Sequence, residues 1–145
     1  MRKRDKFVLL LTVAAVFLLM LGLYPFQMKK ESLVSAKTNE ISKIVVTEYQ
    51  GESVTVKARE QIERIIDYIN MAEVDFDSWF LLRSSHWDLR VSIYGTDSDG
   101  KSVIKDNFYI TYDGFVSKHD FIYDLSDFDY DYFLTLARSG EKAEE

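Results

Sequence analysis

Cysteine is absent from this chain of 145 residues, and proline occurs once, at Pro25. The absence of cysteine excludes disulfide bonds, thiolate metal sites, a cysteine nucleophile and a lipid-modified cysteine anchor. Composition excludes disorder of the whole chain, because 47% of the residues are hydrophobic and 14% are aromatic. The length leaves room for one domain.

The longest apolar run covers residues 7–26 (FVLLLTVAAVFLLMLGLYPF) and contains no charged residue. In a helix that rises about 1.5 Å per residue, a run of this length spans the roughly 30 Å hydrocarbon core of a bilayer. The run therefore predicts a transmembrane anchor from Phe7 to Phe26, and Pro25 suits a helix that ends there. Residues 1–6 carry a formal charge of +3, which predicts a cytoplasmic tail and places the rest of the chain outside the plasma membrane.

A cleaved signal peptide is the alternative interpretation of this region. Val34, Ser35 and Ala36 are small residues at the spacing that a signal peptidase requires. The apolar run is longer than the 7–15 residues of an ordinary signal-peptide core, and charged residues separate it from this site. We therefore expect a retained anchor, with a secreted inhibitor or a ligand- or calcium-binding domain released near Ala36 as the alternative.

Outside the anchor the chain is strongly acidic. Residues 31–145 contain 23 Asp and Glu against 12 Lys and Arg, a formal charge of −11. Such a surface is repelled by nucleic acid, so nucleic-acid binding is excluded first. The acidity either keeps the domain soluble or attracts cations or a basic partner.

The first half of the domain predicts a hairpin and a helix. Residues 27–40 are polar and without a steady period, and they predict a stalk. Alternation and β-branched residues predict two strands, over 41–49 and 53–57. Residues 59–71 predict an amphipathic helix, because four isoleucines repeat at spacings of three and four and must pack on Val54 and Val56. The isoleucines are Ile62, Ile65, Ile66 and Ile69.

The second half predicts four more strands and a helix. Alternation predicts strands over 87–94 and 101–111, with Ile104, Phe108 and Ile110 on one face and a bulge near Asp106. Asp113-Gly114 predicts a tight hairpin turn to a strand over 115–117, and another strand covers 121–123. A last helix is expected to be capped by Ser126, to present Phe128, Tyr132 and Leu136 on one face, and to end at Gly140.

The resulting order is ββαββββα. It predicts an α+β domain over residues 41–138, with an antiparallel sheet of about five to six strands and two helices on one side of it. Residues 139–145 form an acidic tail.

No convincing catalytic arrangement is visible, so no catalytic residue is assigned. His86 and His119 have serines and aspartates nearby in the sequence, but the chain contains no Gly-x-Ser-x-Gly motif. A hydrolase that uses one of these histidines is the alternative. We expect a protein that is not an enzyme and needs no cofactor.

Asp97, Asp99 and Gly100 resemble the middle of a calcium loop, with Asp106 near its closing position. The match is poor, because Gly95 stands where the first aspartate belongs and the closing residue is shorter than the usual glutamate. An Asp- and Gly-rich turn explains the same residues. A second group of aspartates lies at the start of the last helix, where carboxylates stabilise the helix by interacting with the positive end of its dipole. This role requires no metal ion. The group comprises Asp124, Asp127, Asp129 and Asp131.

Two groups of aromatic and apolar residues are candidates for partner binding. Trp79, Phe80, Leu81 and Leu82 either close the core or form an exposed patch. Tyrosines, with Trp87, could line a face that stacks on glycans or binds a peptide. The candidates in this second group are Trp87, Tyr109 and Tyr112.

A basic start and an apolar anchor precede ISKIVVTEYQGESVTVKAREQIERIIDYIN, which predicts a hairpin followed by an isoleucine-rich helix, and FYITYDGF follows before a last helix. In this architecture the chain resembles the small extracytoplasmic domains that Gram-positive bacteria tether to the membrane by a helix or a lipid. The resemblance covers most of residues 41–138 and implies a location and a binding role. We therefore expect a single-pass protein with a cytoplasmic N-terminus, whose outer domain binds an envelope protein without catalysis.

Overall fold

The computed structural model describes residues 3–28, 32–79, 86–119 and 121–139, and it divides into two compact units, residues 1–31 and 32–145. The first unit contains one long helix, α1 (Lys3–Met28). Its window Asp5–Gly22 has a mean hydropathy of 2.1 and none of it is buried. Within the described residues, α1 is the helix that is long and apolar enough to cross a membrane. It continues past Pro25, which was expected to end it.

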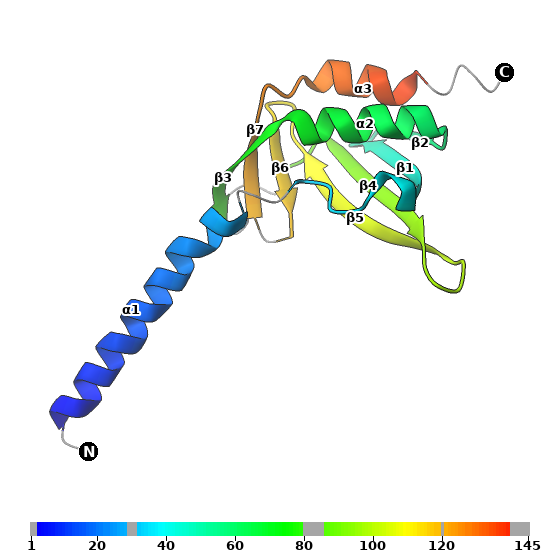
Figure 1. The fold of residues 1–145 in the computed structure, drawn as a ribbon. Helices are drawn as coiled ribbons and strands as arrows, with labels where there is room; N and C mark the ends of the chain where they lie inside the picture. Colours follow the sequence, from blue (N-terminus) through cyan, green and yellow to red (C-terminus); the bar gives the residue numbers. More distant parts are fainter. Residues whose placement is uncertain (1–2, 29–31, 80–85, 120, 140–145) are drawn as a thin grey trace. The chain divides into compact units, whose positions relative to one another are not determined.

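The second unit is an α+β domain built on one antiparallel sheet, as predicted (Figure 1). The sheet has seven strands in the order β2-β1-β4-β5-β6-β7-β3, and every neighbouring pair is antiparallel. The strands are β1 (Ile41–Glu48), β2 (Ser53–Val56), β3 (Glu73–Trp79), β4 (Leu89–Thr96), β5 (Ser102–Ile110), β6 (Phe115–Lys118) and β7 (Phe121–Ser126).

Strand β3 was not predicted, so the element order is ββαβββββα. It pairs with β7 at one edge of the sheet, and its register shifts between Phe76 and Ser78. A bulge inserts one residue and breaks the alternation of apolar and polar residues by which a strand is recognised in a sequence. The stretch therefore had no periodic signal over its full length.

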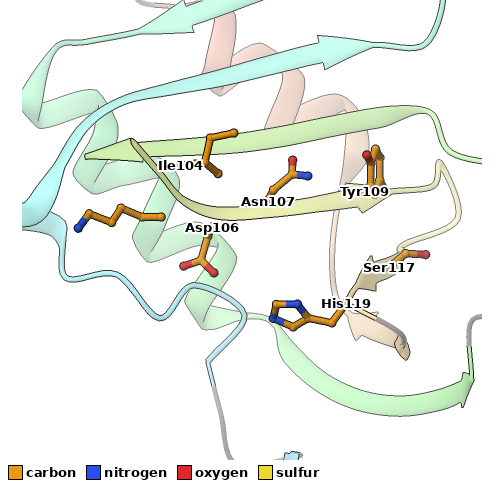
Figure 2. A pocket seen from close by; sticks show the side chains of 7 residues that line it. Ile104, Asp106, Asn107, Tyr109, Ser117 and His119 are labelled. Carbon is orange, nitrogen blue, oxygen red and sulfur yellow. The ribbon is translucent and has the colours of Figure 1, made fainter. Parts of the chain in front are cut away.

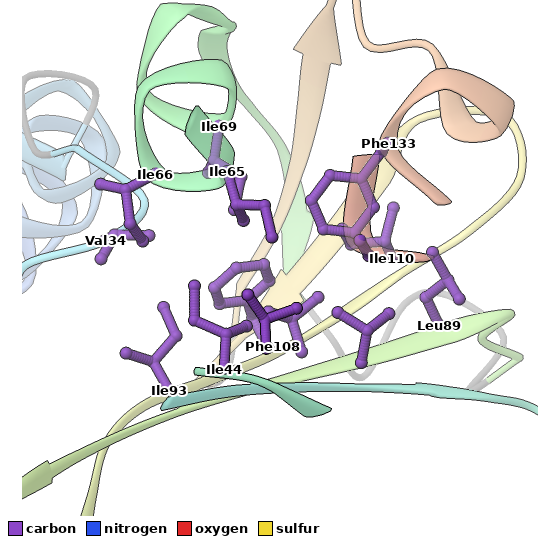
Figure 3. Packing of buried hydrophobic residues seen from close by; sticks show 14 of the residues in the cluster. Val34, Ile44, Ile65, Ile66, Ile69, Leu89, Ile93, Phe108, Ile110 and Phe133 are labelled. Carbon is purple, nitrogen blue, oxygen red and sulfur yellow. The ribbon is translucent and has the colours of Figure 1, made fainter. Parts of the chain in front are cut away.

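Helix α2 (Arg59–Met71) has the predicted bounds and buries the predicted isoleucines. It lies on one side of the sheet with α3 (Tyr130–Arg138) (Figure 1). Figure 3 shows the isoleucines of α2 above Phe108 and Ile110 of β5, with Phe133 of α3 beside them. The predicted partners Val54 and Val56 belong to the same buried cluster.

Two details of α3 differ from the prediction. The N-cap is Asp129, whose side chain accepts a hydrogen bond from the amide of Tyr132, whereas Ser126 ends β7. The later start rotates the inward face, so that Tyr132 is 52% exposed and the buried residues are Phe133, Leu134 and Ala137. Gly140, the expected end of the helix, lies outside the described residues.

The bulge predicted near Asp106 is present. Ile93 pairs with Asp106 whereas Tyr94 pairs with Ile104, so Lys105 is the additional residue. Because the bulge reverses the alternation, Asp106 is buried and Ile104 is 57% exposed. The prediction that Ile104 shares the buried face of Phe108 was therefore wrong.

The turn at Asp113-Gly114 connects β5 and β6 as predicted, but its geometry differs. Of Asp113 and Gly114, the two residues expected at its centre, only Gly114 has a positive φ, of 87°. The amide of Gly114 donates to the carbonyl of Thr111, and Thr111 in turn donates to the carbonyl of Phe115. This is a turn followed by a glycine bulge, in which one residue with a positive φ is sufficient.

Part of the predicted stalk belongs to the domain. Leu33 and Val34 are 3% exposed and lie in the hydrophobic core, and a short 3-10 helix, η1 (Thr38–Glu40), leads into β1. The compact unit begins at Ser32, which is earlier than the predicted boundary at residue 41. Two apolar residues in a polar segment are too short a signal to reveal this packing from the sequence.

Candidate functional site

The sheet face that points away from α2 and α3 carries the main candidate site. We call it the outer face and define it by the side chains that alternate with the buried residues of β2, β1, β4, β5 and β6. Across these strands they form three rows, which are Lys43–Tyr94–Ile104, Thr55–Val45–Ser92–Asn107 and Ser53–Thr47–Arg90–Tyr109–Ser117.

The outer face lacks acidic residues along all five of these strands, each of which the structure describes in full. Its charged members are Lys43 and Arg90, although residues 31–145 have almost twice as many acidic as basic side chains. Acidic residues begin on the next strand, where Asp124 pairs with Phe115. The outer face is thus a neutral to basic area on an acidic domain.

Hydroxyl and amide groups on the outer face bond to each other across the strands. The hydroxyls of Thr47 and Ser53 are 3.0 Å apart, and Ser92 donates to the side-chain oxygen of Asn107 at 3.1 Å. Lys43 lies 4.7 Å from the ring centre of Tyr94. Arg90 is exposed, and no hydrogen bond or ion pair of its guanidinium occurs within the described part of the chain.

An aromatic cluster lies at one end of the outer face. Trp87 packs against Tyr109 with ring centres 5.4 Å apart and against Tyr49 at 5.2 Å, and His86 lies 6.0 Å from Tyr49. The structure thus brings together two of the predicted binding residues, Trp87 and Tyr109. Tyr49, which is 51% exposed, was missed because it ends a strand and has no distinctive neighbours in the sequence.

Tyr112, the third predicted aromatic residue, is not part of this cluster. Its ring lies 5.0 Å from that of Tyr130 in α3, and its amide donates to Asp88. The other candidates, Trp79 to Leu82, are not tested. The backbone of Trp79 ends β3, whereas its side chain and residues 80–82 lie outside the described part of the structure.

A cavity of about 450 Å³ lies beside the bulge of β5 (Figure 2). Ile104, Asp106, Asn107 and Tyr109 from β5 and Ser117 from β6 line it, together with Lys105 of the bulge and His119. The volume is within the range of small-molecule sites, and the cavity shares Tyr109 with the aromatic cluster. The cavity and the aromatic cluster are therefore neighbours on one surface.

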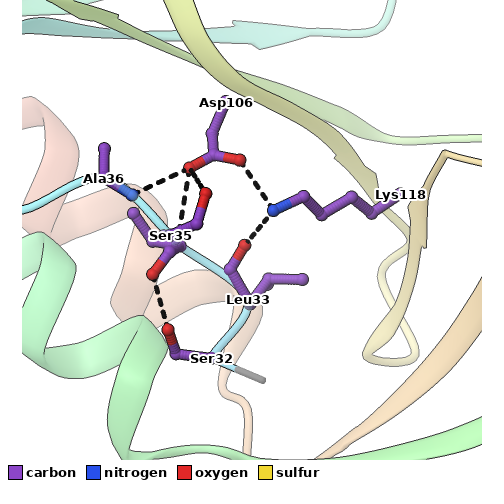
Figure 4. Close-up of polar contacts among 7 residues, drawn as sticks. Ser32, Leu33, Ser35, Ala36, Asp106 and Lys118 are labelled. Carbon is purple, nitrogen blue, oxygen red and sulfur yellow. Dashed lines mark hydrogen bonds and ion pairs between the residues drawn. The ribbon is translucent and has the colours of Figure 1, made fainter. Parts of the chain in front are cut away.

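Behind the cavity, Asp106 and Lys118 form a buried ion pair that was not predicted (Figure 4). The ammonium of Lys118 lies 2.7 Å from one carboxylate oxygen and also donates to the carbonyl of Leu33. The other oxygen accepts from the amide and hydroxyl of Ser35 and from the amide of Ala36. The pair fastens the segment before η1 to the sheet.

Burial alone would raise the pKa of Asp106, but its bonds to Lys118 and Ser35 outweigh burial and hold the pKa below the usual value of 3.8. The side chains of Asp106 and Lys118 are only 5% and 12% exposed. Asp106 is therefore an ionised group with fixed partners at neutral pH.

The three predicted metal ligands are not brought together. One oxygen of Asp97 accepts from the amides of Asp99 and Lys101, which is the bonding of an Asx turn. Asp106 lies three pairs along the hairpin from Thr96 and Ser102 and is bonded to Lys118. Among the described residues no group of three His, Cys, Asp or Glu could hold a metal ion.

The two histidines have different surroundings. His86 is 61% exposed, and its Nε2 lies 3.1 Å from Asp88. His119 has a φ of 54° in the connection between β6 and β7 and lines the cavity. The serines expected beside His86, Ser84 and Ser85, lie outside the described residues.

Comparison with known proteins returned no match to a protein family, to a curated protein or to a solved structure.

Proposed function

We propose that this protein is a membrane-anchored binding module of the bacterial cell envelope, with a cytoplasmic N-terminus and an outer domain that binds an envelope component without catalysis. Helix α1 supports the anchor by its length and hydropathy. The positive charge of residues 1–6 supports the orientation.

The observation that carries the binding role is the outer face. It combines an aromatic cluster, a cavity and an arginine with no protein partner in the described residues, on strands that α2 and α3 leave uncovered. Exposed aromatic and arginine side chains are the residue types that contribute most to binding in recognition surfaces. Scattered single apolar residues would not have this meaning.

Residues 32–36, which we call the fastened segment, support retention of the anchor over release near Ala36. Val34 is buried, and the amides of Ser35 and Ala36 bond to Asp106. Cleavage after Ala36 would remove Leu33 and Val34 from the core and leave the buried ion pair with fewer partners. The released fragment would lack part of its own fold.

Photo-crosslinking in intact cells tests the proposal. The full chain carries a benzophenone amino acid at position 49, and a matched chain carries it at position 132. Tyr49 belongs to the cluster at the outer face whereas Tyr132 belongs to α3, and the two tyrosines are 51% and 52% exposed. We expect a discrete adduct in the membrane fraction from position 49 and none from position 132.

Adducts of equal yield from both positions would contradict a specific surface, and no adduct from position 49 would contradict the binding role. Because benzophenone reacts with C–H bonds, the probe captures proteins and glycans alike. A tag at the C-terminus that is accessible to an impermeant reagent only after lysis would contradict the orientation.

A further inference from the structure

We infer that the outer face binds an anionic polysaccharide, that is, a chain of sugars that carry carboxylate or phosphate groups. This inference rests on the proposed binding role and identifies the chemistry of the envelope component. It uses three properties of the outer face, which are its charge, its aromatic cluster and its hydrogen-bonding rows.

Charge is the first property, and Arg90 is its centre. Arg90 lies between Thr47 on β1 and Tyr109 on β5, on strands without an outward-facing acidic side chain. A planar guanidinium binds a carboxylate or a phosphate group through paired hydrogen bonds. The domain supplies no such anion to Arg90 within its described residues, so the complementary group belongs to the ligand.

Unlike Arg90, two arginines on the helical side pair with carboxylates of the domain, whereas Arg59 of α2 donates to the carbonyl of Thr38. Arg64 pairs with Glu60 at 2.6 Å in α2, and Arg138 of α3 pairs with Glu48. A domain with an excess of carboxylates could have neutralised Arg90 in the same way. The cross-strand neighbours of Arg90, Thr47 and Tyr109, carry no carboxylate, and this gives charge complementarity to an anion.

The aromatic cluster is the second property. Tyr109 is the direct cross-strand neighbour of Arg90 and packs against Trp87, which packs against Tyr49. Tyrosine and tryptophan present an apolar ring with a polar tip, and this combination suits the apolar face and hydroxyl rim of a sugar. The anion-binding group and the stacking platform are thus adjacent on one surface.

The third property is the supply of neutral hydrogen-bonding groups. Ser92 donates to the side-chain oxygen of Asn107, and this bond leaves the amide nitrogen of Asn107 as a donor toward the cavity. Ser117 and Tyr109 add hydroxyls to the cavity wall. Hydroxyl and amide groups in rows match the regularly spaced hydroxyls of a polysaccharide.

An acidic peptide is the other anionic partner to consider, and the geometry favours the sugar polymer. Peptides dock as an added strand at a sheet edge or through apolar anchors in a groove. The strands that carry Arg90 and Tyr109, β4 and β5, are paired on both sides.

Calorimetric titration of the full chain in phosphatidylcholine nanodiscs tests this inference, because these neutral lipids add no competing charge. The probes are polygalacturonate and phosphorylated dextran as the two anionic polymers, unmodified dextran as the neutral polymer, and polyglutamate as the acidic peptide. The variants are Arg90→Gln and its matched control Arg64→Gln, which removes the same charge from α2.

We expect at least one of the two anionic polymers to bind. Its affinity should be lower by about tenfold or more for Arg90→Gln and unchanged for Arg64→Gln. Tyr109→Phe, which retains the ring, should weaken binding less than Tyr109→Ala, and circular dichroism checks that each variant is folded. Binding should also weaken as salt is raised, because Arg90 is exposed.

Binding of polyglutamate as tightly as the anionic sugars would overturn the inference in favour of an acidic protein partner. No binding of either anionic polymer, or equal losses in Arg90→Gln and Arg64→Gln, would also overturn it. The crosslinking experiment separates the two proposals. An adduct at position 49 whose added mass is unchanged by periodate would leave the binding role standing and remove the polysaccharide.

Discussion

At the scale of single residues, Asp106 has the most specific environment in the domain. It is a buried carboxylate that joins β5 to β6 through Lys118 and to the segment before η1 through Ser35 and Ala36. Removing two charges from water is costly, and the cost is offset only where every lone pair and proton finds a partner. Both carboxylate oxygens of Asp106 are bonded and the ammonium of Lys118 donates to two acceptors, so the site largely meets this condition.

Replacement of Asp106 should therefore destabilise the domain. Asp106→Asn leaves the ammonium of Lys118 buried without its counter-ion, and we expect the free energy of unfolding at pH 7 to fall by about 3–5 kcal/mol. Asp99→Asn, in an exposed turn, should change it by less than about 0.5 kcal/mol. Urea unfolding measures both, and equal small effects would show that the pair has no structural role.

The same pair predicts how stability depends on pH. The folded pKa of Asp106 lies below its unfolded value of 3.8, so its contribution is fully present above that value and is lost as the pH falls through the folded pKa. The difference in unfolding free energy between wild type and Asp106→Asn should thus shrink as the pH is lowered below 3.8. A difference that stays constant over this range would mean that Asp106 is not ionised in the fold.

At the scale of elements, helix α2 shows how a strong periodic pattern determines packing. Its isoleucine stripe enters the space between the sheet and α3, where Ile65 and Ile69 are fully buried. A buried side chain of this size contributes about 1.5–3 kcal/mol through its removal from water, and more when its loss leaves a cavity.

Two isoleucines provide a matched test of this packing. Ile65→Ala should lower the free energy of unfolding by about 2–5 kcal/mol, because Ile65 has no exposed surface. Ile104→Ala should change it by less than about 1 kcal/mol, because Ile104 is 57% exposed beside the bulge. Thermal or urea unfolding distinguishes them, and a large loss for Ile104→Ala would show that the bulge places this side chain elsewhere.

The elements also show which features could be predicted from the sequence. The fold class, the bounds of α2 and the bulge near Asp106 follow from spacing and residue type, because one local pattern determines each of them. Strand β3 could not be predicted, since its bulge removes the alternation. The outer face was found only in part, because cross-strand register brings Tyr49 and Arg90 beside Trp87 and Tyr109, and a single sequence does not reveal register.

At the scale of the whole molecule, the boundary between the two units lies before Ser32, ahead of the fastened segment. The core of the domain therefore includes residues that stand before the first strand. Val34 lies beside Ile66 of α2 (Figure 3), and Leu33 belongs to the same buried cluster. Packing against the sheet and α2, and not the position of the first strand, therefore determines where the domain begins.

Two shortened chains test this boundary. A chain that begins at Ser32 keeps the fastened segment, whereas a chain that begins at Lys37 loses the burial of Leu33 and Val34 and the bonds to Asp106. We expect the second chain to be less stable in urea by at least about 3 kcal/mol. Equal unfolding midpoints would restore the view that residues 32–36 are a simple stalk.

The two outer strands of the sheet bear on how neighbouring copies of the protein coexist. Open strand edges pair readily with one another, and proteins held in one membrane meet at a high local concentration. Strand β2 is only four residues long, and β3 combines a bulge with acidic residues at Asp75 and Asp77. Short, bulged and charged edges resist edge-to-edge aggregation. The fold can therefore be crowded along a bilayer without joining into fibres.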